Sequence, residues 1–129
     1  MRKFNFSFCF ITFILTLISC HKIEPTKTTI TAVNEMKVPI ANVKVVIRAQ
    51  PSQVVSAKGN LSDSAYTNAK GQVEFDYSSI YQDGQAGVAV LDITGVIITG
   101  NDTLEGASYV QLDAGITKPA TVILRKKKK

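Results

Sequence analysis

Histidine, cysteine and tryptophan are nearly absent from this chain of 129 residues, which has one histidine, two cysteines and no tryptophan. No HExxH, CxxC or GxSxG pattern and no glycine-rich phosphate loop occurs in it. The usual sequence signatures of zinc enzymes, dithiol oxidoreductases, serine hydrolases and nucleotide-binding proteins are therefore missing. The carboxylates from residue 63 onwards are scattered over expected turns and exposed strand faces, so we predict that the protein is not an enzyme. A small hydrolase with two convergent carboxylates is the weakest alternative.

One long apolar segment lies at the N-terminus. Arg2 and Lys3 precede an apolar run over residues 8–18, which the small residue Ser19 closes. The run is shorter than the roughly 20 apolar residues that a spanning helix needs, so a single-span anchor is the weaker interpretation. A basic start, a short apolar core and a small residue before the cleavage point are typical of an export signal.

The sequence Leu17-Ile18-Ser19-Cys20 resembles the lipobox of bacterial lipoproteins. The resemblance implies removal of residues 1–19 and lipidation of Cys20, with residues 20–27 as the lipidated N-terminus and tether. Cys9 would be lost with the leader, which leaves Cys20 without an intramolecular partner in a compartment where cysteines normally pair. A thioether to lipid accounts for that lone cysteine. Plain secretion, with a free thiol or an intermolecular disulfide, is the alternative.

The resemblance also predicts a location in the cell envelope. Acyl chains contribute about 0.8 kcal/mol per buried methylene, so two or more chains anchor a protein stably in a membrane. In the sorting rule of such lipoproteins, aspartate after the cysteine favours the inner membrane. His21 stands there instead, which favours the outer membrane and leaves open whether the protein faces the periplasm or the surface. A histidine beside the anchor is also poorly placed for catalysis in a cleft.

The positive charge is concentrated at the two ends of the chain. Two of the 15 basic residues lie in segment 1–19, and the mature chain keeps the other 13 against 10 acidic residues. The basic tail carries five of these charges and consists of Arg125, Lys126, Lys127, Lys128 and Lys129. The rest of the mature chain is slightly acidic, which argues against a nucleic-acid partner. The tail could contact anionic headgroups or an anionic polysaccharide, at about 1 kcal/mol per residue near a membrane. A solvated end without such a role is the alternative.

The mature chain has the alternating pattern of β-strands. Turn signals rich in Gly, Asn and Asp separate the strands, which is typical of a β-sandwich. A short helical turn over residues 78–81 is the one helical alternative. We predict an all-β fold, a single immunoglobulin-like antiparallel β-sandwich of about seven strands over residues 28–125, followed by the tail 126–129. The expected strands are 28–33, 43–48, 72–77, 88–93, 96–98, 109–112 and 120–124.

Two segments resemble a known domain family. Residues 33–45 contain a polar turn, a proline and then alternating valines, and residues 67–75 contain a threonine, a polar turn and a glycine before an alternating strand. Both are similar to the hallmarks of transthyretin-like, carboxypeptidase-regulatory-type domains. Met36-Lys37 departs from the pattern, since an aspartate-glycine pair is common there. The resemblance implies an accessory binding or spacing module and supplies no catalytic residue.

Few residues are candidates for a binding site. Tyr81, in a predicted loop, and Tyr109 are the tyrosines that we expect to be exposed for a ligand, whereas Tyr77 shares a strand face with the core. Asp102 with Glu105, or the carboxylate of the Asp83-Gly84 turn, could offer oxygens to calcium. Turn formation is the simpler role for such residues, so we predict no metal and no cofactor.

These observations predict a lipid-anchored envelope protein that acts as a non-catalytic binding or structural module. The expected partners are the membrane, through the N-terminal lipid, and another envelope protein or a surface glycan. A polysaccharide-binding accessory protein with exposed tyrosines is one alternative. A stalk unit with an uncovered edge strand is another.

Overall fold

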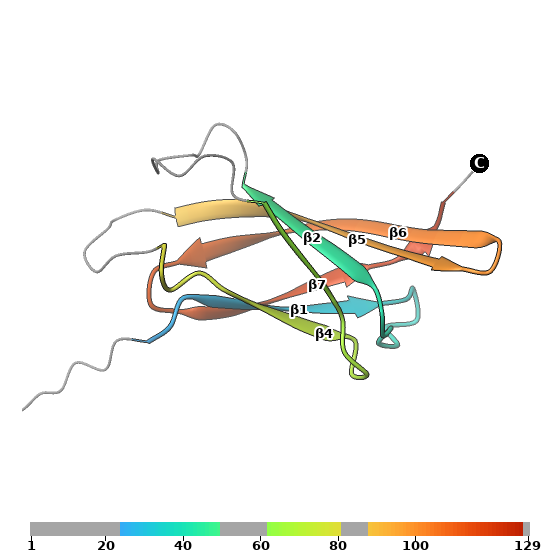
Figure 1. The fold of residues 1–129 in the computed structure, drawn as a ribbon, viewed down its shortest axis with the longest axis horizontal. Helices are drawn as coiled ribbons and strands as arrows, with labels where there is room; N and C mark the ends of the chain where they lie inside the picture. The colour runs from blue at the N-terminus through green and yellow to red at the C-terminus, as the bar shows by residue number, and fades with distance from the viewer. Residues whose placement is uncertain (1–23, 50–61, 81–87, 128–129) are drawn as a thin grey trace, which may run out of the picture.

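The computed structural model describes residues 24–49, 62–80 and 88–127. These residues form two facing β-sheets, a three-stranded sheet of order β4-β1-β7 and a five-stranded sheet of order β3-β2-β5-β6-β8 (Figure 1). The expected all-β sandwich is therefore confirmed. Within the described ranges there is no helix that is long and apolar enough to cross a membrane. The strands are β1 (Lys27–Val33), β2 (Lys44–Ala49), β3 (Ser62–Tyr66), β4 (Gln72–Asp76), β5 (Val88–Thr99), β6 (Asp102–Asp113), β7 (Thr117–Ile123) and β8 (Arg125–Lys126).

The core lies between the two sheets and is built from every second residue of the strands. In β4, for example, Val73 and Phe75 are buried while their neighbours are exposed. Tyr77 continues this row, is 2% exposed and stacks on Phe75 with ring centroids 6.5 Å apart. The alternation in the sequence thus arises because one face of each strand is removed from water. Other fully buried side chains are Ile30, Val45, Ile47, Leu91, Ile93, Leu112, Val122 and Leu124.

Several strands differ from their predicted lengths. The expected strands 88–93 and 96–98 are one continuous strand, β5, because Gly95 lies in the ladder opposite Gly106 and does not form a turn. Its partner β6 begins seven residues earlier than expected. The edge strand β3 was not predicted, since its side chains are nearly all polar and exposed. Residues 78–80 form a turn closed by the N–H of Ile80 on the carbonyl of Tyr77, 3.0 Å, rather than a helical turn.

The sandwich contains one parallel pair, between β1 and β7, whose register runs from Lys27 opposite Thr117 to Val33 opposite Ile123. The chain then changes sheets. The N–H of Leu124 bonds the carbonyl of Val33 at 2.8 Å, and the next two residues pair with β6 as β8. The N–H of Lys127 also bonds a β6 carbonyl, that of Thr103, at 2.9 Å. The domain therefore extends beyond its expected end at residue 125, because the start of the basic tail hydrogen-bonds to the sheet.

A glycine pair makes this change of sheets possible. Gly95 and Gly106 face each other across β5 and β6 and lie beneath the end of β7. A methyl group on Gly106 would lie 2.2 Å from the carbonyl oxygen of Ile123, whereas one on Gly95 would meet the side chains of Leu124 and Val122 at 3.1 and 3.2 Å. Only the absence of a side chain at position 106 lets the backbone of β7 approach so closely.

The two segments that resemble the domain family pack against each other. The buried hydroxyl of Thr67 donates to the carbonyl of Ile40 at 2.8 Å and accepts the N–H of Val43 at 3.0 Å. Gly71 has a φ of 72°, and a Cβ there would lie 2.8 Å from Pro39. In the first turn, Lys37 has a φ of 61°, so it takes the left-handed conformation that glycine adopts with less strain.

We expect Gly106→Ala to lower the free energy of unfolding by about 3 kcal/mol or more, because the Ile123 backbone must move away from β6. Gly95→Ala is the matched control and should stay within about 1 kcal/mol of wild type, since flexible side-chain ends can yield there. Urea denaturation followed by circular dichroism measures both. Equal effects of the two substitutions would contradict the close backbone contact.

Thr28 is fully buried, and its hydroxyl oxygen has no hydrogen-bond partner among the residues that the structure describes. Thr28→Val should therefore raise the free energy of unfolding by about 1 kcal/mol, because it removes a buried, unsatisfied polar group. Thr121→Val, on the exposed face of β7, should change stability by less than about 0.5 kcal/mol. Thermal unfolding of both variants checks the difference, and a destabilised Thr28→Val protein would show that the hydroxyl is bonded.

Candidate functional site

The outer face of the five-stranded sheet carries two exposed tyrosines. Tyr66 on β3 is 65% exposed and Tyr109 on β6 is 70% exposed, in contrast to the buried Tyr77. Both belong to the set of outward-pointing residues, since the inward positions of β2, β5 and β6 are the buried ones. We call this surface the tyrosine face and define it by six residues: Tyr66, Tyr109, Lys44, Val46, Asp92 and Thr94.

The strand register fixes how these residues are arranged. Lys44 lies beside Tyr66 and Asp92 lies beside Tyr109, each as the directly paired residue on the neighbouring strand. Val46 and Thr94, which pair with each other, lie on the diagonal between the two rings. The rings are three strands apart across the sheet and four residues apart along it. At about 4.8 Å per strand and 3.3 Å per residue, this places them roughly 20 Å apart.

Only part of this face can be predicted from the sequence. Tyr109 is exposed as expected, although its role in binding stays a prediction. Tyr81 lies outside the described residues. Tyr66 cannot be placed on this face from the sequence, because β3 has no apolar alternation that marks it as a strand. The only signal was the two-residue spacing of Ser62, Ser64 and Tyr66, which all point outward.

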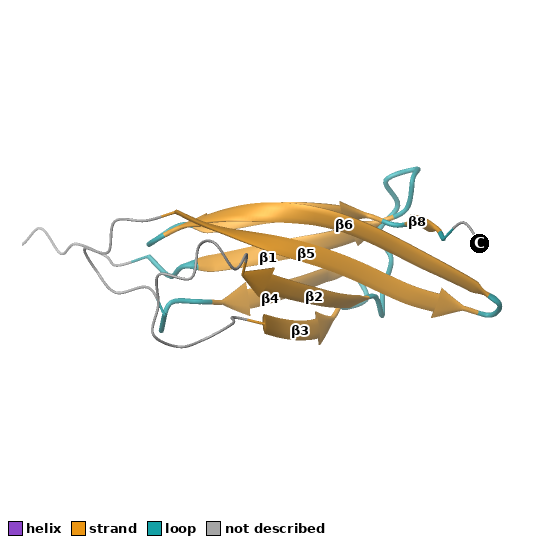
Figure 2. Cartoon of the chain, turned by 90° about the horizontal axis from the view of Figure 1, so that it is seen from above, coloured by secondary structure: helices purple, strands orange, loops and turns teal. Residues whose placement is uncertain are grey.

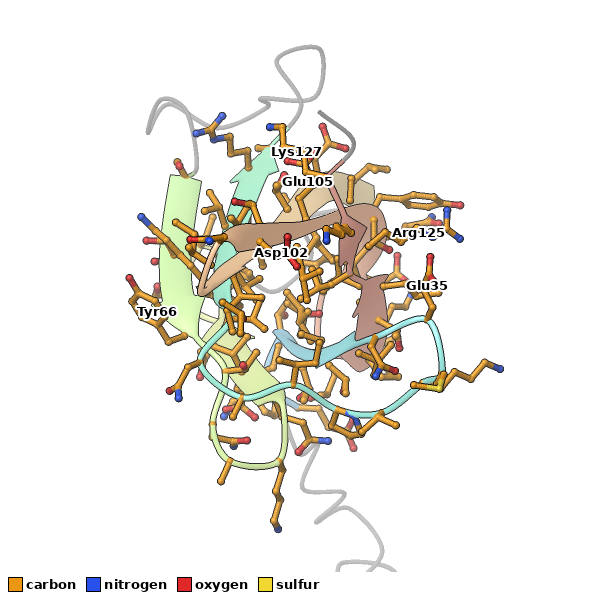
Figure 3. All side chains as sticks on the ribbon, turned by 90° about the vertical axis from the view of Figure 1, so that its right-hand side faces the viewer. Glu35, Tyr66, Asp102, Glu105, Arg125 and Lys127 are labelled. Atoms are coloured by element: carbon orange, nitrogen blue, oxygen red, sulfur yellow. The ribbon has the colours of Figure 1, made fainter. Side chains whose placement is uncertain are left out.

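Residues 125–127 of the basic tail lie at the end of the sandwich that also carries the tip of the β5–β6 hairpin (Figure 2). In the described part of the tail, each basic side chain faces a carboxylate, so these charges are locally balanced (Figure 3). Such exposed pairs contribute at most about 1 kcal/mol each. Lys128 and Lys129 lie outside the described residues, and contact of the tail with an anionic surface stays a prediction. The pairs are Arg125 with Glu35 at 3.4 Å, Lys126 with Asp102 at 2.8 Å and Lys127 with Glu105 at 3.1 Å.

The structure does not bring the possible calcium ligands together. Asp102 and Glu105 are three residues apart on β6 and therefore point to opposite faces of the sheet. Each is paired with a lysine. Over the described ranges there is no group of three or more His, Cys, Asp or Glu residues that could hold a metal ion. Asp83, the other candidate, lies outside those ranges.

Thr26 fixes the start of β1 at the opposite end of the sandwich, which we call the tether end. Its N–H donates to the hydroxyl oxygen of Ser78 at 3.0 Å, and its carbonyl accepts the N–H of Tyr77 at 2.8 Å. Its own hydroxyl accepts the N–H of Gly115 at 2.8 Å. Thr26 is only 3% exposed. The chain is thus held at residue 26 by two separate turns, even before the ladder of β1 begins.

The same network shifts two pKa values. The hydroxyl and the N–H of Ser78 donate to Asp76 at 2.6 and 2.9 Å, and together with Lys27 they lower the pKa of the Asp76 carboxyl below 3.8. The hydrogen bond and charge of Glu74, 2.8 Å away, raise the pKa of Lys27. Asp76 and Glu74 lie on the same exposed face of β4, and Lys27 contacts both carboxylates.

No family model matches this chain, and no curated protein is significantly similar to it in sequence.

We expect the Asp76 network to stabilise the fold only while Asp76 is ionised. Because the pKa of Asp76 is lower in the folded state, its contribution is complete above the unfolded value near 3.8 and is lost as the pH falls through the folded value. Asp76→Asn should therefore be less stable than wild type at neutral pH, and the difference should shrink below about pH 4. Urea denaturation at a series of pH values measures this.

Ser78→Ala serves as the companion variant. It removes the principal donor to Asp76, so the pKa of the Asp76 carboxyl, followed by carboxyl-carbon NMR, should rise towards its ordinary value. An unchanged pKa in that variant, or a stability difference for Asp76→Asn that persists at the lowest pH, would show that another interaction holds the carboxylate.

Proposed function

We propose that this protein is a lipid-anchored protein of the bacterial cell envelope, in the outer membrane, whose single β-sandwich acts as a non-catalytic binding module. The observation that supports binding is the tyrosine face, with Tyr66 and Tyr109 exposed on one side of a rigid sheet. Aromatic rings of this kind combine a large apolar surface with a polar hydroxyl, which suits them for recognition. The partner of such a module is another envelope protein or a surface glycan.

The position of Thr26 supports a role close to a membrane. If Cys20 carries the lipid, five residues connect it to Thr26, which is fixed to the body of the domain by three hydrogen bonds. At most about 3.5 Å per residue gives a reach of roughly 20 Å between the two α-carbons. The tether end is then held near the bilayer. The strands run away from this end, so the tyrosine face lies on a side of the sandwich and not at the end nearest to Cys20.

A stalk unit built by β-addition is less well supported. The free edge of β3 would have to accept a further strand, but the N–H of Ser64 is already bonded to the carboxylate of Asp63 at 2.7 Å. Asp63 pairs with the inward-facing Ile47, and a charge at an inward position of an edge strand is a common protection against such association.

Anchoring is tested by expressing the full chain in a bacterial host beside Cys20→Ala and Cys9→Ala. Wild type and Cys9→Ala should enter the detergent phase on phase partitioning, lack residues 1–19 and carry acyl mass, because Cys9 lies in the removed leader. Cys20→Ala should lose the acyl mass and the partitioning. A wild-type protein that is soluble and unmodified would overturn the lipoprotein assignment.

A further inference from the structure

We infer that the tyrosine face binds a linear polysaccharide, which lies along the diagonal from Tyr66 to Tyr109. The inference deepens the proposed function and rests on it for the role of the domain as a binding module. Its basis is the combination of two exposed rings, short side chains between them and charged groups beside each ring.

The rings stand higher than the surface between them. Val46 is half-buried and Thr94 is exposed, and both side chains are much shorter than a tyrosine. Ser64 on β3 and Ala107 on β6 continue the same row on the two strands that carry the tyrosines. The face therefore offers two aromatic platforms, separated on the diagonal by the shorter side chains of Val46 and Thr94, with Lys44 and Arg48 to either side of Val46 on β2. An extended polymer can lie along this diagonal and stack a ring of its own on each platform.

Polar groups lie where hydroxyl groups of such a polymer would be. The ammonium of Lys44 is beside Tyr66, and the carboxylate of Asp92 is beside Tyr109 with Arg48 as its neighbour on β2. Ammonium and guanidinium groups donate hydrogen bonds and a carboxylate accepts them, so both hydrogen-bonding roles of a sugar hydroxyl are met. Apolar rings with polar groups at their edges match the two kinds of surface that a sugar presents.

The composition of the face favours a glycan over a protein partner. The buried centre of a protein–protein interface is depleted in charge and rich in apolar side chains. Here the centre of the face is Thr94 and the half-buried Val46, with Lys44 and Asp92 close by. The other large exposed apolar residues lie off the diagonal, for example Met36 in the first turn and Ile98 near the tip of the β5–β6 hairpin.

The separation of the rings predicts a dependence on ligand length. Because the rings are roughly 20 Å apart, a single sugar can stack on only one of them. A chain that spans the gap contacts both, and its second contact forms at a high effective concentration. Affinity should therefore rise steeply with chain length until both rings are contacted, and then level off.

The test uses the full chain, purified in detergent, and oligosaccharide series from disaccharide to octasaccharide prepared from cellulose, chitin and xylan. Binding is measured by calorimetry, and amide NMR spectra identify the residues that respond. Tyr66→Ala and Tyr109→Ala should each weaken binding of the longest ligand by about three- to tenfold, the energy range of one aromatic contact. The affinity of the double variant should fall by about the product of the two single fold-changes, since the effects of distant substitutions are usually independent.

Two controls separate ring stacking from other effects. Tyr66→Phe and Tyr109→Phe keep the rings and should bind within about twofold of wild type. Ile98→Ala removes a large exposed side chain from the same side of the sheet but off the diagonal, and it should leave the affinity unchanged. Circular dichroism confirms that every variant is folded.

The outcomes are distinct. Length-dependent binding that both tyrosine variants weaken supports the inference. The inference is overturned if no series binds, if binding does not depend on length, or if only a protein partner binds the face and Ile98→Ala weakens it. The intact mass of the same preparation reports the anchor separately. A chain that binds glycan but carries no acyl mass would refute only the lipid anchor. An anchored chain that binds no glycan would refute only the inference of glycan binding.

Discussion

The contact between the backbone of Ile123 and Gly106 is the constraint on which the rest of the structure depends. It lets the last long strand pass over β5 and β6 closely enough to change from one sheet to the other. On one side of this crossing, β7 pairs in parallel with β1. On the other, β8 pairs with β6. One short stretch of chain therefore ties the two sheets together, and a side chain at position 106 would separate them.

The parallel pairing links this crossing to the tether end. Because β1 and β7 run side by side over seven residue pairs, the start of β1 and the turn before β7 lie together. Thr26 can then bond Gly115, and its other groups bond the turn after β4. A force applied to the N-terminus is thus carried by several hydrogen bonds at once. Breaking these bonds together is harder than breaking them one after another. Such a connection suits a domain that is attached to a membrane through its first residues.

The sequence allowed the fold class and most core strands to be predicted, since alternation reports which side of a strand is buried. Val73, Phe75 and Tyr77 are an example. It did not reveal β3, because an edge strand exposes both faces and needs no apolar residues. The position of Tyr66 on the outer face could not be predicted for the same reason. The continuity of β5 through Gly95 could not be predicted either, because a glycine that makes room for a distant backbone looks the same in sequence as one that forms a turn.

The ion pairs of the basic tail could not be predicted from the sequence either. The basic tail is a run of like charges when it is read alone, yet Glu35, 90 residues away from its partner Arg125, faces it across the end of the sandwich. Pairings of this kind depend on which strands meet, and a strand order such as β3-β2-β5-β6-β8 is set by packing of the whole chain. Neighbours in sequence, such as β5 and β6, often pair, but contacts between distant segments such as Glu35 and Arg125 do not follow from local patterns.

The same strand order explains why a binding face on a sheet needs less ordering on ligand binding than one on loops. The positions of Tyr66 and Tyr109 are fixed by main-chain ladders through β2 and β5, so no loop has to be ordered when a ligand arrives. Ordering a side chain costs about 0.5–1.5 kcal/mol on binding, and ordering a loop costs more. A rigid sheet also keeps the distance between the rings constant. Two weak contacts at a fixed spacing then select for the length and straightness of a polymer, which one strong contact cannot do.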